Sequence, residues 1–318
     1  MAAKQKSLFL LRSAAAWAAA ACWAAQAQQA SSTVVITGRT VVGANVAGFG
    51  DTPLARTPLQ AEVFGLGQLK DADVSAIARL TKLDASVADA YNAEGYWSSI
   101  AVRGYTLDNR FNYRRDGLPI NAETAIAFDN KERVELFKGT SGIQAGTSAP
   151  GGLVNLIVKR PQGSLRNVML GFKEHGSLLA AVDMGEQFGK LGLRLNAVVE
   201  ALDPPYRHTR GRRTMTALAA DWKLGPDTLF QAEIETSHQR QPSVAGFSML
   251  GDTVPLASSI DPRVNLNDQP WRQPVEFNGT TASLRLQQRL GDDWHFVAHA
   301  MQQRLKTDDR TAFPFGVY

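Results

Sequence analysis

The sequence predicts an α+β domain followed by an antiparallel transmembrane β-barrel that is incomplete in this chain. Three observations lead to this fold class. A glycine-rich stretch at 132–161 joins two strand-like runs, which indicates a compact mixed domain. After residue 161 the chain repeats segments of about ten residues that alternate apolar and polar side chains, as in a membrane barrel with a wet interior. The connections between these segments are mostly short and long in alternation, which is typical of such barrels.

The first 27 residues have the features of a secretory signal peptide. A basic start is followed by an apolar run from Ser13 to Ala25 and by the small-x-small cleavage site Ala25-Gln26-Ala27. The run is too short and too weakly hydrophobic for a transmembrane helix. Cys22 is the single cysteine and leaves with this peptide, unless it serves as a lipid-attachment site, for which Ala19-Ala20-Ala21 is a poor context. We expect an exported protein.

The charge balance argues against nucleic-acid binding. The formal net charge is +4, from 34 basic and 30 acidic residues. Lys4, Lys6 and Arg12 fall within the leader, which leaves 31 basic residues against 30 acidic ones. Nucleic-acid-binding domains carry a clear basic excess, so we expect no nucleic-acid partner.

The stretch at 132–161 contains two predicted strands. Arg133 to Lys138 alternates polar and apolar residues, which predicts a strand buried on one face, and Leu153 to Val158 is rich in aliphatic residues. The glycines between them require tight turns. A glycine-rich connection in any mixed domain is one interpretation. A phosphate-binding loop is disfavoured, because no Gly-Lys-Ser/Thr ends the run and a strand follows it.

Four further elements are predicted upstream. Leu59 to Phe64 predicts a strand and Ile100 to Val102 a buried one. Apolar spacing predicts a short helix from about Asp71 to Leu83, capped by Asp71 or Asp73. Asp116-Gly117, between Phe111–Arg115 and Leu118–Ile120, predicts a hairpin with a two-residue type I′ turn.

Three motifs in register resemble the plug domain of TonB-dependent outer-membrane siderophore receptors. They are Val102-Arg103-Gly104-Tyr105, Arg115-Asp116-Gly117-Leu118-Pro119-Ile120, and the stretch that contains Arg-Val-Glu, Pro-Gly-Gly-x-x-Asn and Lys-Arg-Pro. The resemblance implies a plug domain over 59–161. It implies a structural role for the motif positions Gly104, Asp116, Gly117, Glu132, Arg133, Glu135, Gly139, Gly151 and Gly152.

Residues 28–58 form an N-terminal segment with a short β-prone run and a linker. The run comprises Thr33, Val34, Val35, Ile36 and Thr37. From its residues alone it is an ordinary first strand or a segment that adds to the sheet edge of a partner. The resemblance implies the second, as a TonB box, with TonB and its inner-membrane energising complex as partner.

The resemblance also implies the ligand-binding residues. Matching against ferric hydroxamate receptors points to Arg103, Asn121 and Gln144, whose donors can bond the oxygens of a chelate. Gln144 stands where relatives commonly have Tyr. The alternative for Arg103 is an ion pair with a carboxylate of the plug or the barrel.

The plug is also rich in charged residues. A barrel around it would require them to pair across the plug–barrel boundary, whereas a solvated face is the simpler interpretation. The residues in question are Arg103, Arg114, Arg115, Asp116, Glu132, Arg133 and Glu135.

Residues 162–318 are expected to form about the first seven strands of the barrel. A soluble β-sandwich is the alternative. Seven strands cannot close around a domain, since plugged transporters use about 22. The predicted strands are Leu165–Lys173, Ser177–Glu186, Leu191–Leu202, Thr214–Leu224, Thr228–Gln239, Gly279–Leu290 and Trp294–Lys306.

No catalytic constellation is found, so we expect a binding and transport protein rather than an enzyme, with no cofactor and no metal. His295 and His299 share a strand face but lie about 13 Å apart at strand rise, too far for one metal ion. The expected function is TonB-energised uptake of a ferric siderophore at the cell outer membrane, whose lipid surrounds the barrel. Haem, cobalamin or a glycan are alternative ligands, and a passive barrel or surface protein is the alternative class.

Overall fold

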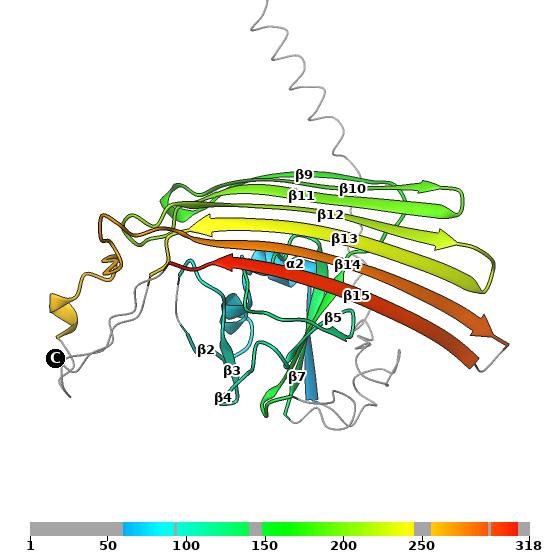
Figure 1. Ribbon diagram of the computed structural model, residues 1–318, viewed down its shortest axis with the longest axis horizontal. Coiled ribbons are helices and arrows are strands. Elements are labelled where there is room, and N and C mark those ends of the chain that lie inside the picture. Colours follow the sequence, from blue (N-terminus) through cyan, green and yellow to red (C-terminus); the bar gives the residue numbers. More distant parts are fainter. Residues whose placement is uncertain (1–59, 92–93, 140–147, 245–255, 292–293, 311–318) are drawn as a thin grey trace, which may run out of the picture. The chain divides into compact units, whose positions relative to one another are not determined.

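The structure, a computed structural model, describes residues 60–91, 94–139, 148–244, 256–291 and 294–310 (Figure 1). The predicted signal peptide, the TonB-box-like segment, the linker and Gln144 lie outside these residues. Among the described residues, no helix is long and apolar enough to cross a membrane.

The plug is built from two small sheets and two short helical segments. Its main sheet has five strands in the order β1-β7-β8-β5-β6, and a second sheet has three in the order β2-β3-β4. The elements are β1 (Gln60–Gly65), α2 (Leu66–Asp71), the 3₁₀-helix η3 (Ile77–Lys82), β2 (Val87–Asp89), β3 (Ile100–Val102), β4 (Tyr105–Thr106), β5 (Tyr113–Arg115), β6 (Leu118–Pro119), β7 (Lys131–Lys138) and β8 (Gly152–Val158).

Strands β7 and β8 form the centre of the plug. They pair antiparallel, β1 adds to the other edge of β7, and β5 pairs parallel to β8. The alternation in β7 predicts one buried face, but the strand is buried on both: Val134, Glu135 and Leu136 are each 0% exposed. The prediction of a half-buried strand is therefore wrong, because the polar residues Arg133 and Glu135 pair with each other, and Glu135 also accepts a hydrogen bond from Asn155 of β8.

The turns of the motif regions have the expected conformations. Asp116 and Gly117 both have positive φ, 47° and 88°, as a type I′ turn requires. Gly152 has a different reason for being glycine: a Cβ there would lie 1.8 Å from the carbonyl oxygen of Phe137 on the neighbouring strand. The close approach of β7 and β8 thus depends on this missing side chain.

The predicted helix at 71–83 is wrong in extent and in its cap. The chain forms α2 before it and η3 within it, separated by a break in which Asp73 has a φ of 47°. Neither Asp71 nor Asp73 caps η3, whose N-cap residue is Ala76. Val74, Ile77 and Leu80 nevertheless enter the core. The apolar spacing thus predicted which residues are buried, but not the backbone conformation that buries them.

The second half of the chain forms one antiparallel sheet of seven strands, in sequence order from β9 to β15 (Figure 1). All seven predicted strands are confirmed, with small shifts of their ends. They are β9 (Leu165–Phe172), β10 (Leu178–Phe188), β11 (Leu191–Leu202), β12 (Gly211–Lys223), β13 (Thr228–Gln241), β14 (Val275–Leu290) and β15 (Trp294–Asp308).

The two faces of this sheet differ sharply. On the face away from the plug, Leu170, Phe172 and Phe188 are 81%, 78% and 60% exposed. On the plug-facing side, Glu233 and Glu235 of β13 are buried. An apolar outer face and a polar inner face are the pattern of a membrane barrel and exclude a soluble sandwich core between two sheets.

The connections define two ends of the sheet. The tight turns lie at one end, where Trp222 and Trp294 are 50% and 75% exposed, as in the aromatic girdle of a barrel rim. The connection at 203–210 and the described parts of the connection after β13, residues 242–244 and 256–274, lie at the other, which we call the long-loop end. The short β9–β10 connection, with its 3₁₀ turn η4 (Glu174–Gly176), also lies there.

Candidate functional site

The plug meets the sheet through buried ion pairs, of which the central set joins β5 and β7 to β13. Arg115 of the plug contacts Glu233 and, at 2.8 Å from its Nη1, Glu235. The Nζ of Lys131 lies 2.7 Å from the same Oε2 of Glu235, to which the side-chain amide of Asn130 also donates, at 2.6 Å. The side chains of Arg115 and Glu233 are 5% and 1% exposed, and that of Lys131 is 0% exposed. We call these five residues the central ion cluster.

The electrostatics of the cluster follow from this burial. Burial opposes the charged form of Arg115, but Glu235 and Glu233 raise the pKa of its guanidinium above the ordinary value. Burial, and then the neighbouring charge of Arg115, lowers the pKa of Lys131. Charges that are buried this completely persist only when they are paired, so the cluster holds the plug against the seven-stranded sheet, which we call the wall.

Two further groups repeat the pattern on neighbouring strands. Arg213 of β12 joins Asp129 of the plug, at 2.6 Å, to Glu200 of β11. Lys159, at the end of β8, lies 2.9 Å from Asp183 of β10, which Arg194 of β11 also contacts. The plug contributes mainly cations and the wall mainly carboxylates, so the boundary has a charge complementarity that fixes the docking register.

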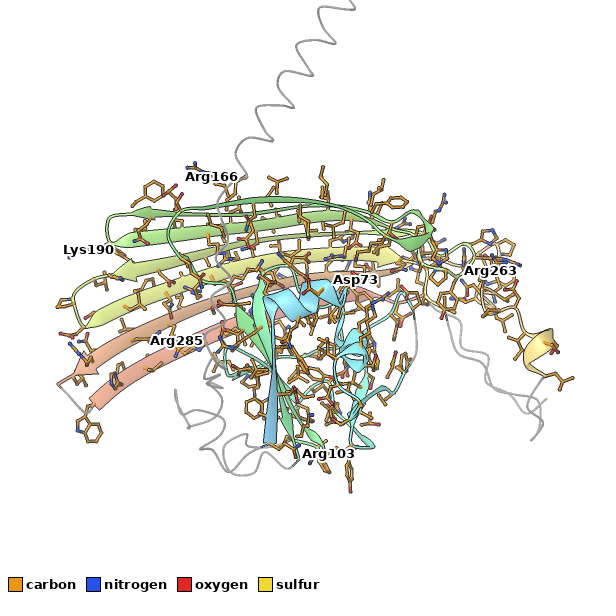
Figure 2. The ribbon with its side chains drawn as sticks, turned by 180° about the vertical axis from the view of Figure 1, so that it is seen from behind. Asp73, Arg103, Arg166, Lys190, Arg263 and Arg285 are labelled. Atoms are coloured by element: carbon orange, nitrogen blue, oxygen red, sulfur yellow. The ribbon has the colours of Figure 1, made fainter. Side chains whose placement is uncertain are left out.

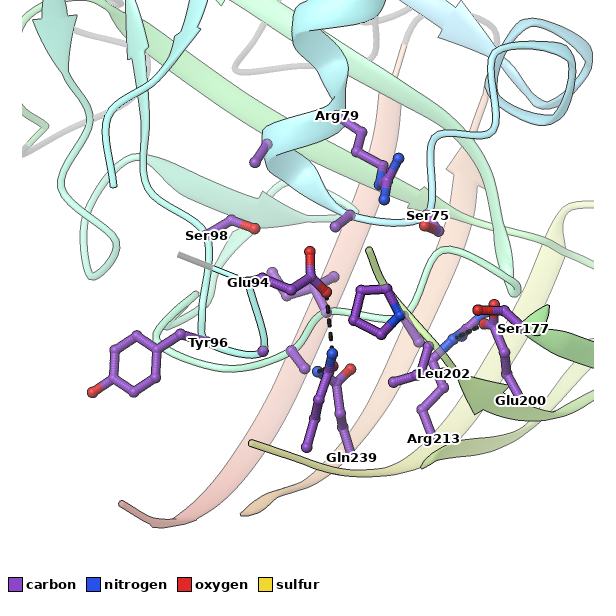
Figure 3. Close-up of a pocket in the computed structure, with 18 of the residues that line it drawn as sticks. Ser75, Arg79, Glu94, Tyr96, Ser98, Ser177, Glu200, Leu202, Arg213 and Gln239 are labelled. Carbon is purple, nitrogen blue, oxygen red and sulfur yellow. Dashed lines mark hydrogen bonds and ion pairs between the residues drawn. The ribbon is translucent and has the colours of Figure 1, made fainter. Parts of the chain in front are cut away.

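A cavity of about 910 Å³ lies between the plug and the long-loop end of the sheet (Figure 3). Its plug side comes from η3, the segment 94–98 and residues 122–127, and its wall side comes from the ends of β9 to β13. Most carboxylates of the lining are already engaged: Glu200 with Arg213, Asp73 with Lys173 and Asp203 with Arg210. Arg79 forms no ion pair with any described residue and points toward this space in Figure 3.

The plug segment 94–97 is anchored to the wall beside this cavity. The side-chain amide of Gln241 donates to Glu94 at 3.2 Å, and the backbone N–H of Val244 donates to the carbonyl of Glu94 at 2.9 Å (Figure 3). Tyr96 contacts Asp309 and packs edge-on against Phe277, with ring centroids 6.0 Å apart. The cavity wall formed by the plug is therefore fixed directly to the strands that carry the external connections.

The predicted ligand residues are not brought together around this cavity. Arg103 is exposed on the β3–β4 turn, where it contacts Gln60, on the side of the plug away from the seven-stranded sheet (Figure 2). Neither it nor Asn121 lines the cavity. The side chain of Asn121 accepts the N–H of Glu123, while its backbone N–H and carbonyl bond Gln303 of β15. Of this set, Gln144 is outside the described residues, and the set stays a prediction.

The alternative of an ion pair for Arg103 is not what the described residues show, since its partner there is an amide. Among the charged plug residues, Arg115 pairs across the boundary as expected. Arg133 instead pairs with Glu135 on its own strand, and Glu135 accepts a hydrogen bond from Asn155. Among the described residues, Arg133 thus pairs within β7 and not across the boundary.

Sequence reasoning missed much of the boundary. Lys131, Asn130, Asp129 and Lys159 all flank the strands already identified, yet nothing in their spacing marks them as buried. Glu233 and Glu235 are on the polar face of an alternating strand, which a water-filled lumen explains equally well. Two acids at i and i+2, on a face whose other polar residues are uncharged, were the available signal. Among the described residues, no group of three or more His, Cys, Asp or Glu is placed to hold a metal ion.

Comparisons with known proteins agree with this architecture. Residues 53–153 match the TonB-dependent Receptor Plug Domain family. Curated relatives include the metal-pseudopaline receptor CntO of Pseudomonas aeruginosa, 29% identical over 51% of this chain, and the ferrichrome receptor FcuA of Yersinia enterocolitica, 24% identical over 59%. The chain spans 23% and 26% of the length of these two proteins.

Solved structures show the same fold. The closed form of the ferric-catecholate import receptor Fiu from E. coli superposes with a TM-score of 0.75 at 20% identity, covering 85% of this chain and 40% of that one. The ferric preacinetobactin receptor BauA from Acinetobacter baumannii gives 0.71 at 18% identity, covering 83% and 40%. The proteins with which the chain aligns are receptors rather than enzymes. The chain thus contains a domain that matches the TonB-dependent receptor plug family, followed by a sheet with the fold of part of the barrel in the solved receptors.

Proposed function

We propose that the chain belongs to a cell-outer-membrane receptor that imports a ferric siderophore with energy supplied through TonB. The observation that carries this proposal is a folded plug held against a barrel-type wall by buried ion pairs, beside a cavity at the long-loop end. A passive pore has no need of such an obstruction. The names of the relatives, which include ferrichrome, ferrioxamine and ferric-pyoverdine receptors, support a metal chelate as ligand.

The segments outside the described residues complete this proposal. Cleavage after Ala27 would release a mature chain that begins at Gln28 and is delivered to the outer membrane. Thr33–Thr37 would then lie in the periplasm and pair as a strand with TonB. Arg103, Asn121 and Gln144 would contact the chelate from the plug.

The test is uptake of ⁵⁵Fe by cells that carry the receptor as their single siderophore receptor. Supplied as hydroxamate, catecholate and mixed chelates, iron should enter with at least one class and not when TonB is deleted. Uptake that is unaffected by the deletion would indicate the passive barrel. Uptake of haem, cobalamin or a glycan, but of no iron chelate, would support the proposal of a TonB-dependent receptor and contradict a ferric siderophore as its ligand.

A further inference from the structure

Arg285 of β14 is a cation at the plug–wall boundary with no ion-pair partner among the described residues. Its guanidinium makes no ion pair with any described residue, and its Nε is buried without a hydrogen-bond partner. The side chain extends from the middle of the sheet (Figure 2) and is only partly exposed. By contrast Arg289, four residues further along β14, pairs with Asp227 in an exposed contact. A partly buried, unpaired guanidinium is costly for the fold.

Arg285 faces a polar cavity of about 350 Å³. The plug lines the opposite side with two carboxylates, Asp116 of the β5–β6 turn and Glu132 of β7. Neither forms an ion pair with a described cation: Asp116 accepts the N–H of Val158, and Glu132 has a 3.5 Å contact from Gln162. A cavity of this size and polarity has room for several water molecules, so the hairpin can move into it by displacing water rather than packed side chains.

The β5–β6 hairpin that carries Asp116 is also the hairpin that carries the central cation. Arg115 directly precedes Asp116 and binds Glu233 and Glu235 of β13. This docking leaves two buried groups unsatisfied, the Nε of Arg115 and the Oε2 of Glu233. Gln231 of β13 is the register partner of Arg285, so the two docking positions lie side by side on adjacent strands.

We propose that Arg285 is a second docking position for the β5–β6 hairpin, which Asp116 occupies when Arg115 leaves Glu233 and Glu235. This inference rests on the proposed function, since it concerns the movement of the plug that import requires. If the plug detached without finding new partners, buried charges on both sides of the boundary would be left unpaired. Exchanging one ion pair for another on the next strand lowers that barrier and gives the plug two discrete positions.

The test compares ⁵⁵Fe-chelate uptake by the intact receptor with Arg285→Gln and with the matched control Arg289→Gln. Arg285→Gln should slow uptake by roughly tenfold, while chelate binding to whole cells is unchanged. The melting temperature of the purified protein should stay the same or rise, because an unpaired cation has been removed. Arg289→Gln should alter neither the uptake rate nor the binding.

Asp116→Asn keeps the acceptor for Val158 and tolerates the positive φ of the turn, so it removes only the charge. It should slow uptake as much as Arg285→Gln does, and the double variant should be no slower than either single one. Uptake at the wild-type rate by Arg285→Gln, or additive losses in the double variant, would overturn the inference. Absence of TonB-dependent uptake by the wild-type receptor would instead count against the proposed function.

Discussion

At the scale of single residues, the boundary is governed by the cost of separating buried charges. Glu235 receives Arg115, Lys131 and Asn130 at once, so it is the residue whose loss leaves the most cations without compensation. The sequence shows Glu235 as one polar residue in an alternating strand. Its partners come from residues 115 and 130–131, and such long-range pairings have no signature in local spacing.

We predict that Glu235→Gln lowers the free energy of unfolding by about 3–5 kcal/mol, the usual cost of removing one partner from a buried ion pair. Glu186→Gln is the matched control. It breaks a pair with Arg166 whose side chains are 37% and 77% exposed, and such pairs contribute only about 0–1 kcal/mol. Denaturant unfolding of both purified variants measures the difference. Equal effects would show that the cluster is solvated rather than buried.

A second residue, Asp84, should make the stability of the plug depend on pH. Burial acts to raise the pKa of its carboxyl, but the ion pair with Lys138, at 2.5 Å, and hydrogen bonds from Ser86 hold it below its ordinary value. A folded-state pKa below the unfolded one adds stability above about pH 3.8, and this stability is lost as the pH falls through the folded value.

Asp84→Asn should therefore reduce stability at neutral pH and flatten its fall in the acid range, so that the difference between the two proteins shrinks as the pH falls below about 3.8. Melting temperatures between pH 3 and pH 7 measure this. Asp89→Asn, an exposed acid five residues along the chain, is the comparison. Parallel curves for the wild type and Asp84→Asn would contradict the assignment.

At the scale of elements, the sequence predicted most strands and turns but not their surroundings. The I′ hairpin at Asp116-Gly117 and the seven barrel strands follow from local chemistry, namely turn residues and period-2 alternation. The helix near 71–83 failed because its apolar spacing is satisfied by a helix, a break and a 3₁₀ turn together. Strand β7 was assigned one buried face, because alternation cannot show whether its polar face meets water or other polar side chains of the plug.

Gly152 tests the packing of the two central strands. Gly152→Ala places a Cβ 1.8 Å from the carbonyl of Phe137, so β7 and β8 must separate or the plug must unfold. Gly67→Ala in α2 meets nothing within 4 Å and should stabilise by about 0.5–1 kcal/mol, as alanine does in a helix. Melting temperatures that move in opposite directions fit this packing. A neutral Gly152→Ala would contradict it.

At the scale of the whole molecule, two features of the fold can be predicted from local sequence patterns, and a third, the charge complementarity between plug and wall, cannot. The plug motifs and the alternating strands are local, and both were predicted. Complementarity between plug cations and wall carboxylates appears only when the two halves are docked. The candidate site follows the same division, since the cavity lining comes from widely separated parts of the chain and Arg103 and Asn121 are not in it.

The same complementarity explains how the plug can be both secure and movable. The contacts between plug and wall include many charges and polar side chains, whose strength depends on geometry, in contrast to the apolar core of the plug itself. These polar contacts are the ones that must break if force on the N-terminal segment is to move the plug away from the wall. TonB is the partner we propose for that segment.

The proposed coupling to TonB is tested most directly by measuring both chelate uptake and chelate binding in Val35→Pro. Proline removes a backbone N–H from the segment Thr33–Thr37, so strand addition to TonB should fail. Val35→Thr keeps the N–H and the β-propensity and is the control. We predict that Val35→Pro binds the chelate with unchanged affinity and imports none, while Val35→Thr imports it normally. Import by Val35→Pro at the wild-type rate would contradict it.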